Sequence, residues 1–318
     1  MMKKIVSLVL ALMLCLSCVS ALAAEAWTVT CPWAPSGVAA MVNQKAASLS
    51  TTYSQDYVLV ANAEKGDTAT INSWLTKYTE ADPQMCFIGE GMFGITAILD
   101  PERMNFTYDD FKYVENLYSS IFVASARKEL GITSIDALKA YLEEGNQIMV
   151  GTNGATGSEA FLAAALIGAM GYGDQFYLIP YESAAEAAQA VTRGEVDIAV
   201  SHQSQILETW QQGGVDVFAA FDGEPIAQGP FKGVEGVGQY GYPYFRNRCF
   251  IFAKAGADEQ KIADLKALYA QILTDEEMVD WLNNTMLLEA DMMTEEEVIA
   301  HIDNVKNIVD EYYDLVAE

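Results

Sequence analysis

After residue 26, short apolar segments alternate with longer segments whose apolar residues recur every three or four positions. The short segments have the length of buried strands and the longer ones that of amphipathic helices. Strands are predicted at 27–33, 57–62, 85–89, 148–151, 176–180, 196–200 and 215–219. Helices are predicted at 39–49, 68–78, 134–143, 158–170, 184–193, 202–212, 258–273, 275–283 and 294–316. This alternation is typical of an α/β fold in which helices flank a mostly parallel sheet.

Two places interrupt the alternation. The strand-like segments 112–117 and 121–126 follow each other directly, and the apolar run 248–253 follows a long Gly-rich stretch. We expect the chain to cross between two lobes at both places, and its 318 residues are enough for two domains of roughly 150 residues each. The predicted first lobe is discontinuous, with residues 25–125 and 226–318, and the second lobe spans residues 126–225.

Residues 1–24 have the pattern of a signal peptide. Lys3 and Lys4 precede an apolar run, 5–16, and small residues follow at 21–24. The apolar run is shorter than the roughly 20 residues that span a bilayer, which argues against the alternative of an uncleaved membrane anchor. We therefore expect an exported, periplasmic or cell-envelope protein. Cys18 offers lipid anchoring as a variant, although Cys15-Leu16-Ser17 lacks the usual pattern before it.

Charge and cysteine content exclude several classes of protein. The formal net charge is −26, with 18 Lys and Arg against 44 Asp and Glu, and repels phosphate backbones, so no nucleic-acid partner is expected. Removal of the signal peptide leaves Cys31, Cys86 and Cys249, without the spacing of a zinc site. One bridge between Cys31 and Cys86 is an open alternative, but buried free thiols are favoured.

Sequence motifs of common enzymes are missing. The sequence contains no Gly-x-Ser-x-Gly elbow, Walker loop or His-Glu-x-x-His. Residues 236–241 match the dinucleotide fingerprint by letter, but no strand precedes them and Pro243 follows where a helix should begin. We therefore expect neither catalysis nor a cofactor.

Three turns after predicted strands combine glycine with hydroxyl or amide side chains. They are 151–158, 34–37 and 65–68. Backbone N–H groups at the start of a helix lack internal partners, and glycine lets an anion approach them. Each turn alone is an ordinary helix cap, but together they favour a small anionic ligand at the ends of the strands.

His202 directly follows a predicted strand, where open α/β sheets place ligands. It lies in the polar run 201–205, and ligand contact and helix capping remain open alternatives. An exported hydrolase that uses Ser158 or Ser204 with His202 is a rival interpretation, which the missing elbow and the lack of a matched acid disfavour.

These segments together resemble the periplasmic solute-binding proteins of tripartite tricarboxylate transporters, the Bug family. Residues 27–35 are similar to the family's first strand and Pro-rich turn, and 179–183 to its Val-Pro-Tyr-Lys-Gly-Ser segment. Residues 194–197, 201–204 and 253–256 match further family segments in order and spacing. The resemblance implies a two-lobe Venus-flytrap fold of the periplasmic-binding protein type II class, which closes on a solute and delivers it to a membrane permease.

The sequence also departs from the family pattern. Ala40 replaces an Asp that can contact a ligand ammonium, which disfavours an amino-acid ligand, and Glu182 follows Tyr181 where the family has Lys. Glu90 and Glu182 are expected to disfavour a highly charged ligand such as citrate. Arg248, close to the return crossing, is a candidate to grip a carboxylate.

The sequence thus predicts a solute-binding protein for a small organic acid, with a sensor subunit for a membrane kinase as a second rival. The predicted ligand-binding residues are Ser36, Gly37, Gly66, Asp67, Thr68, Glu90, Asn153, Gly154, Thr156, Gly157, Ser158, Tyr181, Ser201, His202, Ser204 and Arg248.

Overall fold

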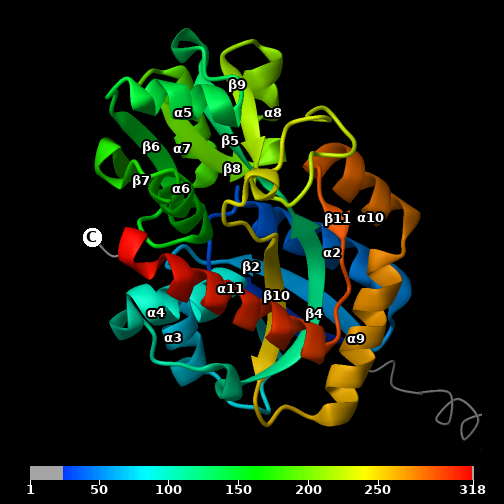
Figure 1. The fold of residues 1–318 in the computed structure, drawn as a ribbon. Helices are drawn as coiled ribbons and strands as arrows, with labels where there is room; N and C mark the ends of the chain where they lie inside the picture. Colours follow the sequence, from blue (N-terminus) through cyan, green and yellow to red (C-terminus); the bar gives the residue numbers. More distant parts are fainter. Residues whose placement is uncertain (1–23, 317–318) are drawn as a thin grey trace, which may run out of the picture.

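A computed structural model describes residues 24–316, and within it the chain builds two separate β-sheets (Figure 1). The predicted signal peptide and Cys18 lie outside the described residues. The first sheet has the order β11-β4-β10-β3-β1-β2 and the second the order β7-β6-β8-β5-β9. The first consists of β1 (Glu25–Cys31), β2 (Tyr57–Ala63), β3 (Gln84–Gly89), β4 (Phe111–Ser120), β10 (Asn247–Lys254) and β11 (Glu289–Ala290). The second consists of β5 (Phe122–Arg127), β6 (Ile148–Asn153), β7 (Phe176–Tyr181), β8 (Ile198–His202) and β9 (Val215–Ala220).

Each sheet is mixed rather than mostly parallel in its pairing, because β10 and β11 in the first sheet and β5 in the second run opposite to the other strands. In the first sheet β1 is parallel to β2 and β3, whereas β10 is antiparallel to both β3 and β4. In the second sheet β6 is parallel to β7 and β8, whereas β5 is antiparallel to β8 and β9. The antiparallel pairs involve the strands at the crossings between the sheets. The chain passes from β4 through Ile121 into β5 of the second sheet, and it returns to the first sheet at β10. The predicted α/β fold with two sheets is confirmed.

Helices cover both sheets. Those that follow the strands of the first sheet are α2 (Val38–Tyr53), α3 (Thr68–Lys77), α4 (Ala97–Leu99), α9 (Glu259–Leu273), α10 (Glu276–Asp280) and α11 (Glu295–Val316). Those around the second sheet are α5 (Ile135–Glu143), α6 (Ser158–Ala169), α7 (Ala184–Thr192) and α8 (Gln203–Gln211). Short helical turns are η1 (Met92–Thr96), η2 (Pro101–Arg103), η3 (Tyr108–Asp110), η4 (Lys128–Leu130), η5 (Gly173–Gln175), η6 (Val237–Tyr240) and η7 (Trp281–Met286). We call each sheet with its helices a lobe.

Local signals explain where the helices begin and end. The side chain of Ser183 accepts a hydrogen bond from the backbone N–H of Glu186 and so caps α7. Gly194, with a φ of 70°, follows its end in the left-handed conformation that glycine adopts without cost. Asp258 caps α9 in the same way as Ser183 caps α7. The predicted helix 275–283 is interrupted, because α10 ends at Asp280 and η7 continues as a π-helical turn.

The segment between β9 and β10 packs against the second lobe. Ile226 and Phe231 are buried in one apolar cluster with Val191 and Val215. Phe245 is buried against Phe161 of α6, with their ring centroids 6.3 Å apart. The sequence-based division assigned residues 226–245 to the first lobe, whereas their contacts lie with the second.

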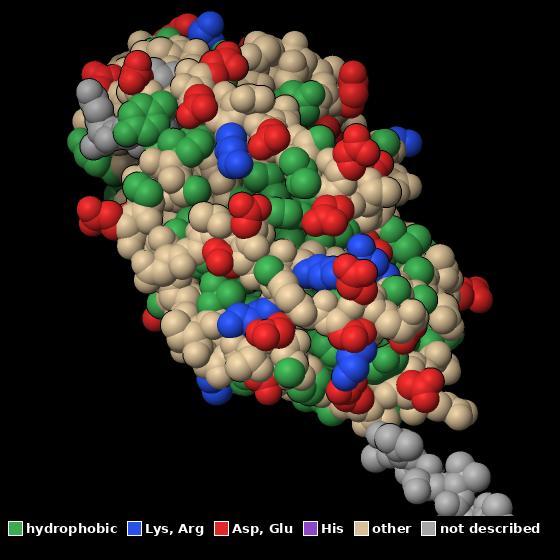
Figure 2. Space-filling view, turned by 90° about the horizontal axis from the view of Figure 1, so that it is seen from below, with side chains coloured by type: hydrophobic (Ala, Val, Ile, Leu, Met, Phe, Trp, Pro, Cys, Tyr) green, Lys and Arg blue, Asp and Glu red, His purple; other side chains and the backbone are tan. Residues whose placement is uncertain are grey.

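The C-terminal helix α11 contacts both lobes. Ile302 packs with Phe252 in a cluster of the first lobe, and Val305 packs with Phe161 in a cluster of the second. In Figure 1 this helix runs below α6, beside the first sheet. Its acidic side chains are among the many that lie on the molecular surface, and on the face in Figure 2 several Lys and Arg side chains lie beside Asp and Glu.

The three cysteines of the described chain, Cys31, Cys86 and Cys249, are free and buried, so Cys31 and Cys86 form no bridge. No helix among residues 24–316 is both long and apolar enough to cross a membrane.

Candidate functional site

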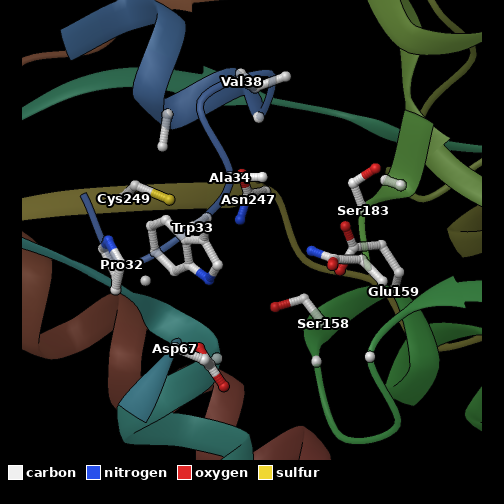
Figure 3. A pocket seen from close by; sticks show the side chains of 18 of the residues that line it. Pro32, Trp33, Ala34, Val38, Asp67, Ser158, Glu159, Ser183, Asn247 and Cys249 are labelled. Atoms are coloured by element: carbon white, nitrogen blue, oxygen red, sulfur yellow. The ribbon is translucent and has the colours of Figure 1, made fainter. Parts of the chain in front are cut away.

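A cavity of about 390 Å³ lies between the two lobes (Figure 3). It is bounded by the segments that follow the carboxyl ends of β1, β2 and β3 in the first lobe and of β6, β7 and β8 in the second. Parallel α/β sheets form ligand crevices at this edge because the loops after their strands gather there. Apolar walls come from Trp33, Met92, Tyr118 and Phe122. The cavity is therefore lined both by polar groups of loops and by apolar side chains, as small-molecule binding sites are.

Most of the predicted ligand-binding residues line this cavity. They are Gly37, Gly66, Asp67, Glu90, Asn153, Gly154, Thr156, Gly157, Ser158, Tyr181 and His202. All three glycine turns that the sequence indicated therefore face one common space.

The other predicted residues lie elsewhere. Ser36 is exposed, and Thr68 is buried at the start of α3. The hydroxyls of Ser201 and Ser204 are buried outside the cavity. Arg248 does not line the cavity either. Its Nε donates to Asp291 Oδ2 at 2.7 Å, and its Nη1 lies 3.1 Å from His301 Nδ1, so its charge is neutralised on the other face of β10.

Two helices, one from each lobe, begin at the cavity with a glycine as the N-cap residue. The N-cap residues are Gly37 for α2 and Gly157 for α6, and neither helix start receives a side-chain hydrogen bond. Gly154 has a φ of 73°, which a glycine tolerates in the turn before α6. A Cβ on Gly157 would approach the Asn153 carbonyl oxygen to 2.9 Å. The chain thus brings uncapped backbone N–H groups of both lobes to the cavity wall.

Glu90 is a fully buried carboxylate at the cavity and contacts both lobes. Its Oε1 accepts from Ser158 Oγ at 3.0 Å and from Asn247 Nδ2 at 2.9 Å, and its Oε2 accepts from the Arg248 backbone N–H at 2.8 Å. Burial raises the pKa of Glu90, while these donors favour its ionised form. Since Ser158 belongs to α6, the carboxyl group links the two lobes in this conformation.

Glu159, in the first turn of α6, also lines the cavity and is only 6% exposed. Burial, together with the carboxyl groups of Glu90 and Asp67, raises the pKa of Glu159 to about 7. Its own backbone N–H and the side-chain amide of Asn153 favour the ionised form. Glu159 is not among the residues that the sequence predicted to bind a ligand. An acidic residue in the first turn of a helix stabilises the helix start, so Glu159 looks ordinary in the sequence. The sequence does not indicate whether its side chain faces a cavity.

Two ion pairs lie at the cavity edge. Lys65 pairs with Glu182 of the opposite lobe, and Arg103 pairs with Asp67 at 3.0 Å. Arg103 Nη1 also donates to Thr156 Oγ1 at 3.0 Å, which again connects the lobes. Asp67 has a φ of 51°, an unusual value for a residue with a side chain and one often found at functional sites.

His202 is buried at the cavity wall and is neutral. Burial lowers its pKa to about 3. Its Nδ1 lies 2.8 Å from Ser120 Oγ, and its ring packs on Phe122 at a centroid distance of 4.7 Å. The hydroxyl of Ser158 instead donates to Glu90, so this geometry provides no pairing of His202 with the nucleophile that a hydrolase would need.

Two sheets joined by crossing strands, with one cavity between their carboxyl ends, define a two-lobe solute-binding protein. Residues 55–307 match the family model described as tripartite tricarboxylate transporter family receptor, and the chain belongs to this family. The family consists of binding receptors rather than enzymes, in agreement with the sequence-based expectation. Comparison with curated proteins finds no match.

Solved structures share the whole fold at low sequence identity. MatC from Rhodopseudomonas palustris, determined with bound malate, has a TM-score of 0.76 at 17% identity, over 92% of this chain and 98% of that one. A second R. palustris protein, determined with adipate, has a TM-score of 0.80 at 14% identity, over 91% and 96%. The periplasmic binding protein BugD has a TM-score of 0.78 at 15% identity, over 92% and 98%. The predicted periplasmic-binding protein fold is confirmed.

Proposed function

We propose that this protein is an exported receptor that captures a small organic acid in the cavity between its lobes and delivers it to a membrane permease of the tripartite tricarboxylate type. The observation that supports this most is the convergence of two uncapped helix starts, one from each lobe, on a single cavity. Unpaired N–H groups there would bind a carboxylate without the help of a basic side chain. Malate and adipate, present in two structures of the same fold, are both carboxylates.

We further propose which residues contact the solute. They are the predicted residues that line the cavity, with Glu159 and Trp33 in addition and without Ser36, Thr68, Ser201, Ser204 and Arg248. For the lobes we propose a division that moves residues 226–245 from the first lobe to the second, because Ile226 and Phe231 pack there.

Binding is proposed to work by a shift between open and closed lobes. The contacts of Ser158 with Glu90 and of Arg103 with Thr156 join the two lobes and would be lost if the lobes separated. A solute that touches both lobes adds its own contacts only in the closed state, and it therefore favours closure. The permease would distinguish the closed form from the open one.

A thermal-shift screen tests the proposed function. We expect at least one small carboxylic acid to raise the melting temperature of the purified protein, because a ligand that binds only the folded state stabilises it by about 2.7 kcal/mol at a hundredfold excess over Kd. Malate and adipate belong in the first panel. If a broad panel of mono- and dicarboxylic acids leaves the melting temperature unchanged, the proposed function is wrong.

Gly91→Ala is expected to weaken binding of the acid that the screen identifies. A Cβ on Gly91 would lie 2.7 Å from Ser158 Oγ of the other lobe, so closure would force this hydroxyl away from Glu90. Overpacking typically costs about 1–3 kcal/mol, which corresponds to a loss of affinity between about fivefold and about a hundredfold. Isothermal titration calorimetry measures this loss.

Gly173→Ala is the matched control for that variant. The nearest atom to a Cβ on Gly173 is Gly168 Cα at 4.0 Å, and this residue lies outside the cavity. Its affinity should equal that of the unmodified protein. Wild-type affinity in Gly91→Ala would mean that the solute binds without the closed contact between the lobes.

A further inference from the structure

The charges that line the cavity are unevenly placed. Among residues 24–316, the basic side chains on its wall are Lys65 and Arg103, and each pairs with an acid at the cavity edge. The Lys65 and Glu182 side chains are 51% and 74% exposed, so this pair is open to solvent. Glu90 and Glu159 line the buried part, and neither forms an ion pair within the described chain. The interior of the cavity is therefore negative wherever these two carboxyl groups are ionised.

The two buried carboxyl groups differ in their surroundings. Glu90 accepts hydrogen bonds from Ser158, Asn247 and the Arg248 backbone, so the fold itself uses its oxygens. The donors near the Glu159 carboxyl group are its own backbone N–H and the Asn153 amide, both on the cavity wall, and no cation pairs with it among the described residues. A buried carboxylate without a cation is unfavourable, whereas the same group beside a bound cation is compensated. Glu159 is therefore placed to receive a positively charged group.

The two helix starts at the cavity also differ. In the first turn of α2, Val38, Ala39 and Ala40 carry no acid, and no acceptor among the described residues reaches their N–H groups. In the first turn of α6, Glu159 already supplies a negative charge to the helix end. Figure 3 shows Val38 and Glu159 on different sides of the cavity, with the Trp33 ring on the side of the first lobe. The positive end of α6 is thus offset wherever Glu159 is ionised, whereas the positive end of α2 has no acid in its first turn.

We propose that the solute is a zwitterion of net charge zero, whose carboxylate binds the N–H groups at the start of α2 and whose ammonium binds Glu159. The inference rests on the proposed function and specifies its ligand class. A second carboxylate would meet Glu90 and Glu159 and be repelled, so dicarboxylic acids bind weakly. Trp33 and Met92 supply apolar contact for the carbon chain between the two charged groups.

Calorimetric titration of matched acids tests this assignment. Each pair differs only by the ammonium group: leucine and 4-methylpentanoate, phenylalanine and 3-phenylpropanoate, 4-aminobutyrate and butyrate. We expect at least one amino-carboxylate to bind about tenfold or more tightly than its partner. If the unsubstituted acids or a dicarboxylate such as malate bind as tightly as every amino-carboxylate, the inference is overturned and the proposed function stands. If no acid of either kind binds, both are overturned.

The Glu159→Gln variant provides a second test of the ammonium contact. Gln keeps the size of the side chain and removes its charge, so affinity for the amino-carboxylate should fall about tenfold while affinity for its unsubstituted partner stays the same or rises. Glu143→Gln, an exposed acid on α5 outside the cavity, is the matched control and should bind as the unmodified protein does. Equal loss of affinity for both acids in Glu159→Gln would show a structural role and would contradict an ammonium contact.

Discussion

Glu90→Ala should lower the free energy of unfolding by about 3 kcal/mol, because three buried donors lose their acceptor at once. The backbone N–H of Arg248 and the amide of Asn247 would remain buried, and leaving such groups unpaired costs about 1–3 kcal/mol each. Part of this cost is offset, since the substitution also removes a buried carboxylate whose pKa burial has raised. Urea denaturation, followed by circular dichroism, measures the change.

Glu90→Gln is the informative comparison. Its carbonyl can still accept from the Arg248 N–H, while its NH₂ can donate to Ser158 Oγ and to the Asn247 amide after that amide turns over. In the unmodified protein Asn247 Oδ1 has no hydrogen-bond partner, so rotating the Asn247 amide by 180° breaks no bond to this oxygen. We expect a loss below about 1 kcal/mol. An Ala variant as stable as the Gln variant would show that the bonds to Glu90 do not stabilise the fold.

Glu159→Gln should stabilise the ligand-free protein at pH 8 and have little effect at pH 4.5. Burial raises the pKa of Glu159 to about 7 in the folded protein, whereas the ordinary pKa of a Glu side chain is 4.5. The folded state therefore binds more protons between these two values, and the free energy of unfolding falls as pH rises through this window. A difference of about 2.5 in pKa corresponds to roughly 3 kcal/mol, and Gln avoids this cost.

Chemical denaturation of both proteins at pH 4.5 and pH 8 measures the effect. Glu143→Gln is again the control and should show no such difference, because that side chain is exposed. If the Glu159→Gln protein is no more stable than wild type at pH 8, the ionised Glu159 carboxylate does not destabilise the fold, and the account of its burial without a cation is wrong. Stability gained at the expense of binding would be the signature of a functional acid.

The sequence predicted the strands and the glycine turns well, because both depend on local patterns. Short segments rich in apolar residues predicted β1, β2 and β3, and the predicted bounds lie within two residues of the observed ones. The turn before α6 requires glycine for a local reason, since Gly154 has a positive φ. Strand order in an α/β fold then brings those turns to one edge of each sheet.

Arg248 lies away from the cavity, unlike the sequence-based expectation, because successive side chains of a strand point to opposite faces. Asn247 and Cys249, its neighbours on β10, line the cavity, so Arg248 lies on the other face beside Asp291. The same alternation places His202 on the cavity wall and Ser201 away from it. Which face of β10 meets the cavity depends on its pairing with β3 and β4, and that register is not visible in the sequence.

The lobe boundary and the role of Glu159 required tertiary contacts. Residues 226–245 contain buried apolar side chains such as Phe231, but an apolar residue in a loop does not indicate which of two cores it joins. The pKa of Glu159 is raised because packing of α6 buries its side chain, and because Glu90 and Asp67, which are far away in the sequence, lie near it. Both facts arise from packing between segments rather than from any one segment.

A crystal structure of the protein with the tightest acid from the screen tests the central claim most directly. We predict the solute between the lobes, with a carboxylate oxygen within hydrogen-bond distance of a backbone nitrogen in the first turn of α2 and with a second contact to the first turn of α6. A solute bound to one lobe alone, or bound outside this cavity, would contradict the account.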